Sequence, residues 1–160
     1  MSSSQVNTYS PSDVDLIVSG YKIFGWDSIS IARNSPGFTP YKGIRGKDSR
    51  DRNTSTSATL SLSITSSCPV NTVLSYVHEL DLEYGTGRLE ITLKDGSGTS
   101  RFASSEAYIL AYPPASFTGD TEYRLWTIYC QSTSSWTLGG NTKPTTPMFD
   151  KITDFASNIF

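Results

Sequence analysis

The sequence predicts a mainly β protein with a single α-helix. Three observations support this fold class. Ser and Thr are very frequent, whereas charged residues make up only 18% of the chain and aromatic residues reach 12%; this composition favours strands. Several segments alternate apolar and polar residues, as half-buried strands do. Only one segment between residues 1 and 141 has the apolar spacing of a helix. A length of 160 residues predicts one domain with its own core.

Residues 13–34 are predicted to form the first hairpin. Apolar side chains alternate in both arms, and the predicted turn lies at Gly25, Trp26 and Asp27. The alternating positions are Leu16, Val18, Tyr21, Ile23, Ile29 and Ile31.

A long loop is predicted for residues 35–55, and it is unusually rich in charge. Its cations are Lys42, Arg45, Lys47, Arg50 and Arg52, and its acids are Asp48 and Asp51. Loops of this length are uncommon in compact domains and are usually functional or mobile. The included acids, and the lack of interleaved aromatics beyond Tyr41, argue against a nucleic-acid patch. Mixed charge favours a contact with another protein surface; a solvated mobile loop is the alternative.

A strand at residues 57–65 is predicted to follow, and then the helix, at about 69–80. In the strand, Leu60, Leu62 and Ile64 share one face, and Thr59, Ser61 and Ser63 share the other. In the helix, Val70, Val73, Leu74, Val77 and Leu80 recur at helical spacing, and Pro69 suits the first turn.

The second half of the chain is predicted to hold another hairpin, at residues 88–110, and a long strand at 121–132. Asp95 to Gly98 is a strong turn signal. Both faces of the long strand are rather apolar. We therefore expect both faces to be buried, either against the rest of the subunit or against another subunit. Residues 1–141 therefore form the predicted β domain, with a mobile N-terminus. Residues 142–160 form a C-terminal arm with apolar residues at roughly helical spacing.

Catalytic and metal-binding patterns are weak throughout. His78 is the one histidine, and no nucleophile–base pair can be assigned to it. The acids Asp81 and Glu83 follow the predicted helix directly, which indicates a solvated helix exit. An enzyme that uses the acids of residues 79–83 is the rival interpretation. Cys68 and Cys130 are expected to be buried thiols, with a disulfide as the alternative. We expect no enzyme, no metal and no cofactor.

No apolar run reaches the length of a membrane span, and the N-terminus does not look like a signal peptide. We therefore expect a protein that folds in the cytoplasm and has no membrane partner.

Several ordered pieces of the chain resemble the tail tube protein of contractile-tailed bacteriophages, which is similar to the type VI secretion tube protein. The most specific pieces are the opening "YSPSDV…G" at 9–20, the pattern "F-T-P…G-x-x-G…R-x-R-N" at 38–53, and "T-S-S-x-P-x-N-x-V-L-S" at 65–75. The resemblance covers residues 9–141.

The resemblance implies a small β-barrel or β-sandwich with one flanking helix. It implies a virion protein, assembled in the host cytoplasm, whose homohexameric rings stack into a hollow tube. The implied partners are other copies of the chain, a tail sheath outside, a tape measure protein and then viral DNA in the lumen, and baseplate and tail terminator proteins at the ends.

The resemblance also places the charged loop at the contact between rings. The loop residues are expected to be disordered or splayed in a free subunit and to meet acids of a neighbouring ring, with Asp13, Asp15, Asp81 and Glu83 as candidates. Lumen-facing residues are expected on the polar strand faces, namely Thr59, Ser61, Ser63, Glu90 and Thr92. A rival interpretation is a β-sandwich binding module that forms no tube, such as a baseplate component or an adhesin.

Overall fold

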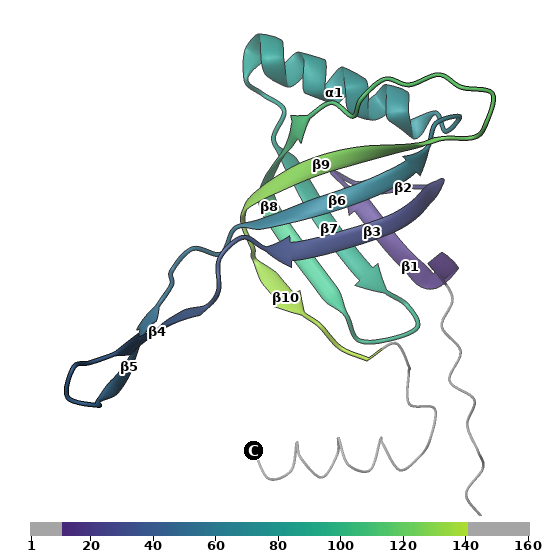
Figure 1. Cartoon of the computed structure of the whole chain (residues 1–160). Coiled ribbons are helices and arrows are strands. Elements are labelled where there is room, and N and C mark those ends of the chain that lie inside the picture. The colour runs from purple at the N-terminus through teal and green to yellow at the C-terminus, as the bar shows by residue number, and fades with distance from the viewer. Residues whose placement is uncertain (1–10, 141–160) are drawn as a thin grey trace, which may run out of the picture.

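The computed structural model describes residues 11–140, which form one sandwich-like body with a projecting hairpin (Figure 1). The elements are η1 (Pro11–Asp13), β1 (Val14–Val18), β2 (Tyr21–Ile23), β3 (Trp26–Arg33), β4 (Phe38–Lys42), β5 (Asp48–Arg52), β6 (Ala58–Thr65), α1 (Val70–Tyr84), β7 (Leu89–Asp95), β8 (Arg101–Ala111), β9 (Tyr123–Ser132) and β10 (Ser135–Thr137). The expected arm at 142–160 and the residues before Pro11 lie outside the described residues.

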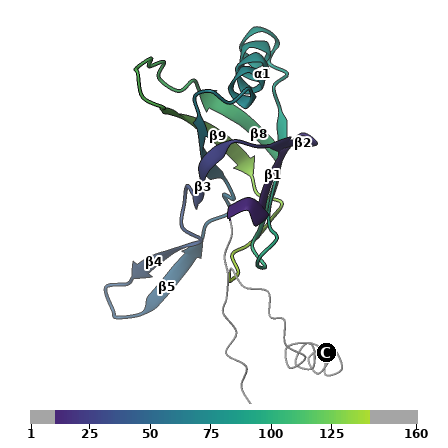
Figure 2. The ribbon, with the colours of Figure 1, turned by 90° about the vertical axis from the view of Figure 1, so that its right-hand side faces the viewer.

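Eight strands form a single antiparallel sheet in the order β2-β1-β7-β8-β9-β6-β3, and β10 pairs with β8. The sheet bends so that β3, β6 and β9 form one layer, which crosses a second layer of β1, β7 and β8 (Figures 1 and 2). The fold is mainly β with one helix, as the sequence predicts. Of the two expected architectures the sandwich is right and the barrel is wrong, since β2 and β3 remain at opposite ends of the strand order and do not pair.

The core lies between the two layers and is built from the predicted apolar faces. Leu60, Leu62 and Ile64 of β6 are completely buried. They pack with Ile128 of β9 and with Leu16 of β1 in the same cluster. The alternation that predicts strand 57–65 therefore identifies the inward face correctly.

Helix α1 lies across one end of the sandwich (Figure 1). It begins at Val70, after Pro69, and is capped after Tyr84 by Gly85, whose φ of 68° is the left-handed conformation that glycine adopts easily. The helix extends beyond its predicted C-terminal end, to Tyr84. The expectation that Asp81 and Glu83 follow the helix is therefore wrong, because both belong to its last turn.

Asn71 attaches the first turn of α1 to the sandwich. Its side-chain amide donates hydrogen bonds to the carbonyl oxygens of Thr65 (2.9 Å) and Cys68 (3.1 Å). Its Oδ1 accepts one from Trp126 Nε1 at 2.9 Å. Asn71 and Trp126 are both buried, so these bonds form where water does not compete.

The first predicted hairpin has its turn at the wrong place. The chain reverses at Ser19 and Gly20, with φ values of 50° and 84°, and joins β1 to β2. β3 pairs with β6 and not with β2. Gly25, with φ of 73°, carries the chain from one edge of the sheet to the other. The second predicted hairpin is correct: β7 and β8 pair on either side of the turn at Asp95.

Candidate assembly surface

The predicted long loop contains a two-stranded β-hairpin, β4–β5, that projects from the body on the side away from α1 (Figures 1 and 2). Five residue pairs join the strands, from Phe38 with Arg52 to Lys42 with Asp48. The turn is closed by hydrogen bonds from the N–H of Gly43 to the carbonyl of Lys47 and from the N–H of Gly46 to the carbonyl of Gly43. The prediction of a loop is therefore wrong for residues 38–42 and 48–52, which form paired strands.

The hairpin has one strongly basic face. Directly paired residues of antiparallel strands lie on the same face. Phe38, Pro40 and Lys42 thus share a face with Arg52, Arg50 and Asp48. On this face the Arg50 guanidinium lies over the Phe38 ring, 4.0 Å from its centre. Asp48, opposite Lys42, is the acid on this face, whereas Asp51 lies on the opposite face, so the three cations Lys42, Arg50 and Arg52 outnumber the acid.

None of the hairpin charges forms an ion pair within residues 11–140, where the two ion pairs are Lys22–Asp15 and Arg88–Glu106. All ten strand residues of β4 and β5 are exposed. An isolated two-stranded hairpin is only marginally stable in water. A projecting hairpin with unpaired charges is therefore a surface suited to contact with another molecule.

The four acids expected to meet the hairpin are in different environments. Asp15 pairs with Lys22 at 2.8 Å. Asp81 accepts a hydrogen bond from the N–H of Gly87 at 2.9 Å, which helps to end α1. Asp13 ends η1, and Glu83 is exposed in the last turn of α1. Asp81 and Glu83 belong to α1, which lies at the far end of the molecule from the hairpin (Figure 1).

The paired positions on the outward face of the β3–β6–β9 layer carry no charge. Strand pairing places Thr59, Ser61 and Ser63 of β6 between residues of β3 and β9. The neighbouring positions on this face are Ser28, Ser30, Ala32, Leu125, Thr127 and Tyr129. The paired positions of this face therefore present mainly hydroxyl groups and no carboxylate or cation, and the exposed Asp27 lies at the bulge between Trp26 and Ser28.

Glu90 and Thr92 do not join that face. They lie on the outward side of β7, where Thr92 pairs with Ile17 and Ala103, and where the adjacent Lys94 pairs with Asp15 and Arg101. Because the inner faces of both layers line one core, their outer faces point away from each other. The five expected lumen residues are thus divided between an uncharged face and a charged face.

The two cysteines are free thiols. Cys130 is fully buried on the inward side of β9, and burial raises the pKa of its thiol. Cys68 is half-buried, and its thiol donates a hydrogen bond to the carbonyl of Phe24 at 3.3 Å.

Several exposed apolar side chains belong to no expected site. Leu110 and Leu125 are each 53% exposed, Phe117 is 84% exposed, and Ile44 at the hairpin turn is completely exposed. Sequence patterns give these residues no role, because alternation shows which face a residue shares but not whether that face is covered. Strand β9 is expected from the sequence to be covered on both faces. In its N-terminal half the face that carries Tyr123 and Leu125 is exposed, so no described residue covers that face.

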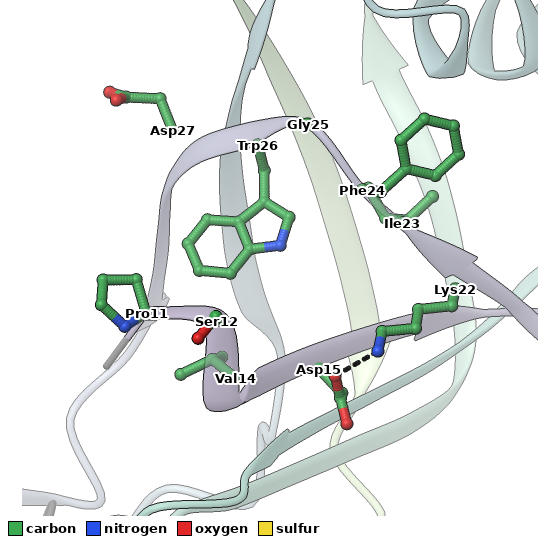
Figure 3. Close-up of a pocket in the computed structure, with 10 residues that line it drawn as sticks. All are labelled: Pro11, Ser12, Val14, Asp15, Lys22, Ile23, Phe24, Gly25, Trp26 and Asp27. Carbon is green, nitrogen blue, oxygen red and sulfur yellow. Dashed lines mark ion pairs between the residues drawn. The ribbon is translucent and has the colours of Figure 1, made fainter. Parts of the chain in front are cut away.

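A hollow of about 290 Å³ lies beside the start of β3 (Figure 3). The Trp26 ring lines it, together with Phe24 and the Lys22–Asp15 ion pair. Within residues 11–140 no group of three or more His, Cys, Asp and Glu side chains is placed to hold a metal ion. No helix among these residues is long and apolar enough to span a membrane.

His78 is packed and not solvent-facing. It is buried on the inward side of α1 and meets the Tyr112 ring edge-on, with 4.6 Å between ring centres. The Tyr112 hydroxyl donates a hydrogen bond to Glu79, which raises the pKa of Tyr112 to about 12. These contacts tie α1 to the segment after β8.

Comparison of the sequence with known proteins gives one informative relative. Over 166 aligned residues the chain is 30% identical to "Structural protein ORF10" of Pseudomonas phage KPP10, and the alignment covers 97% of this chain and 95% of the phage protein. The chain belongs to the family of this phage structural protein. No family model matches the sequence.

The fold is shared with components of contractile injection systems. A sheath/tube terminator of the extracellular contractile injection system PVC matches with a TM-score of 0.59 at 15% identity, over 82% of this chain and 97% of that protein. A chain of the PVC sheath–tube complex matches with a TM-score of 0.55 at 14% identity, over 81% and 90%. The tube-terminating cap of the anti-feeding prophage gives 0.54 at 9% identity, over 84% and 94%. At these identities the likeness shows the fold alone.

Proposed function

We propose that this phage structural protein forms the inner tail tube of a contractile phage. In this proposal six copies form a ring, and rings stack into a hollow tube inside the sheath. The tube holds a tape measure protein and later conducts DNA, and baseplate and terminator proteins close its ends. The observation that carries the proposal is the projecting β4–β5 hairpin, whose ten strand residues are all exposed and whose charges lack ion-pair partners among the described residues.

The uncharged face of β6 suits the lumen of such a tube. DNA must pass without sticking, and a lining of Lys and Arg would bind phosphates and release counterions, which would retain the DNA. Thr59, Ser61 and Ser63 offer hydroxyls without charge, so they are the proposed lumen residues. Glu90 and Thr92 are assigned to the opposite, charged surface, which leaves them for contacts outside the lumen. A strongly positive bore in an assembled tube would contradict this orientation.

Exposed apolar residues at the end of β8 and in the segment between β8 and β9 suit contacts within a ring. Leu110 and Phe117 are each more than half exposed. Burial of such side chains is worth roughly 25 cal/mol per Å² of apolar surface. Covering them with the adjacent copy would explain why a phage structural protein leaves them open in the single chain.

Electron microscopy of the purified protein at high concentration tests the proposal. We expect hollow tubes of many rings. The variant R50E/R52E should fail to stack while keeping its circular dichroism spectrum, because like charges would then meet at the ring contact. The matched control R50K/R52K keeps the charge and should still form tubes.

Two results would contradict the proposal. If R50E/R52E forms normal tubes, the hairpin is not the stacking surface. If the wild-type protein remains a discrete ring or monomer at all concentrations, the tube assignment fails. A second candidate function, a tube terminator, would then be favoured, because the terminator fold matches this chain with a TM-score of 0.59.

A further inference from the structure

Helix α1 carries a row of exposed apolar side chains on the side that faces away from the sandwich. Val73, Tyr76, Leu80 and Tyr84 are between 40% and 68% exposed. Steps of three, four and four residues keep them on one side of a helix that turns about 100° per residue. The buried residues of the helix, such as Leu74 and His78, lie on the other side. Within residues 11–140 nothing covers this row.

The row has an acidic border. Glu79 and Glu83 lie on one side of the row and Asp81 lies on the other. Helix α1 contains no Lys or Arg, so its formal charge is 0 − 3 = −3. Glu79 already accepts a hydrogen bond from Tyr112. Glu83 has no ion pair or hydrogen-bonding side-chain partner among the described residues, which leaves its carboxylate available to a cation from outside.

The turn of the β4–β5 hairpin has the complementary chemistry. Ile44 is completely exposed, Arg45 follows it directly, and Lys47 lies at the other end of the same turn. With five cations and two acids over residues 42–52, the hairpin has a formal charge of 5 − 2 = +3. An apolar tip with adjacent cations matches an apolar row with adjacent acids.

The two surfaces lie at opposite ends of the molecule (Figures 1 and 2). They therefore cannot meet within one chain, but they can meet between successive copies in a head-to-tail stack. We propose that the hairpin tip of one copy docks on the exposed side of α1 of a copy in the next ring. Ile44 lies on the row at Tyr76 and Leu80, and Lys47 or Arg45 pairs with Glu83.

This inference rests on the proposed function and makes it more specific. It selects one acceptor from the four acids that the sequence leaves open. Asp15 and Asp81 have partners in their own chain, whereas Glu83 is free to pair and borders an apolar row. Other occupants of α1, such as a sheath protein or residues 141–160, would give different results in the experiments below.

Cysteine cross-linking between two variants tests the contact directly. Full-length I44C and L80C proteins, each in a Cys68→Ser background, are mixed at high concentration and oxidised gently. We expect a covalent dimer in this mixture that is several-fold more abundant than with either variant alone. The matched control is I44C mixed with L138C, because Leu138 is also an exposed apolar residue (85%) but is not on α1.

The outcomes separate this inference from the tube proposal. Normal tubes without an I44C–L80C product would overturn the docking and leave the tube intact. A strong product without hollow tubes would support the docking and contradict the tube. If L80C of the free subunit reacts slowly with a soluble maleimide, another part of the chain covers α1, and the docking is overturned.

Charge exchange provides a second test. K47E and E83K should each weaken assembly, measured as the concentration at which light scattering begins, by roughly 1.5- to 5-fold, the range for an exposed ion pair. The double variant K47E/E83K should recover most of the loss, because the charges are exchanged and not removed. A double variant as weak as the sum of the two single variants would overturn the pairing.

Discussion

Asn71 is the residue whose replacement should most clearly destabilise the subunit without touching an assembly surface. Asn71→Ala removes the hydrogen bonds to the carbonyls of Thr65 and Cys68 and the bond from Trp126 Nε1. Each hydrogen bond contributes about 1 kcal/mol net, and a buried donor left without an acceptor costs about 1–3 kcal/mol. The better helix propensity of Ala returns only about 0.5 kcal/mol. The two lost bonds and the orphaned donor, less the gain in propensity, give an expected loss in the free energy of unfolding of about 2.5–4.5 kcal/mol.

Urea denaturation followed by far-UV circular dichroism measures this loss. The matched control is Thr72→Ala, an exposed position one residue away, which should change the free energy of unfolding by no more than about 0.5 kcal/mol. A double-mutant cycle with Trp126→Phe measures how much of the loss comes from the Trp126 indole N–H that Asn71→Ala leaves without an acceptor. In the Trp126→Phe background no indole N–H remains at this position, so Asn71→Ala should cost about 1–2 kcal/mol less.

A loss smaller than about 1 kcal/mol for Asn71→Ala, below the range for an orphaned buried donor plus two lost bonds, would refute the reasoning. A cycle without coupling between Asn71 and Trp126 would show that the loss has another source, such as a shift of the whole helix.

Four further predictions concern the core, the cysteines and the backbone. Gly25→Ala should destabilise more than Gly20→Ala, because both have positive φ but only at Gly25 would a Cβ meet the Cys68 Sγ, at 2.5 Å; Cys68→Ala should recover part of that difference in urea denaturation. In Ellman titration at pH 8, Cys68 should react in the native protein and Cys130 only after unfolding. Since burial raises the pKa of Cys130, the stability from its protonated thiol should be lost as pH rises above the ordinary cysteine value. Leu62→Ala should lower the free energy of unfolding by about 2–5 kcal/mol.

Local patterns predict the inward faces correctly, because burial of one strand face imposes a two-residue period on the sequence itself. Leu60, Leu62 and Ile64 are the clearest example, and all three are completely buried. The helix is predicted for the same kind of reason, through a period near 3.6. Such signals lie within one element and need no knowledge of its neighbours.

Strand partners are not encoded so locally, and the first hairpin shows this. The Ser19–Gly20 pair is a turn signal between two alternating segments, and it was available in the sequence. Gly25 gives a similar signal but serves to carry the chain between the two edges of the sheet. Which glycine reverses the chain depends on β6, which lies well beyond both glycines in the sequence and pairs with β3.

The sequence pattern predicts a loop where the β4–β5 hairpin lies, because the hairpin has no buried face. With every strand residue exposed, no apolar alternation is required, and a proline at position 40 and several charges are tolerated. The division of the expected lumen residues between two surfaces could not be predicted from the sequence either. Sequence shows that Ser61 and Glu90 each lie on a polar strand face, but only the packing of the two layers shows that these faces point apart.

The distribution of the complementary surfaces also bears on whether the chain suits a tube or a terminator. A head-to-tail contact leaves one copy of each surface open at every step, so growth does not stop by itself. A terminator that closes such a stack needs only one of the two surfaces. This chain has both: the basic hairpin at one end, and the acidic, partly apolar side of α1 at the other. Two complementary ends on one subunit favour repeated stacking, and hence the tube over the terminator, although the overall fold fits either role.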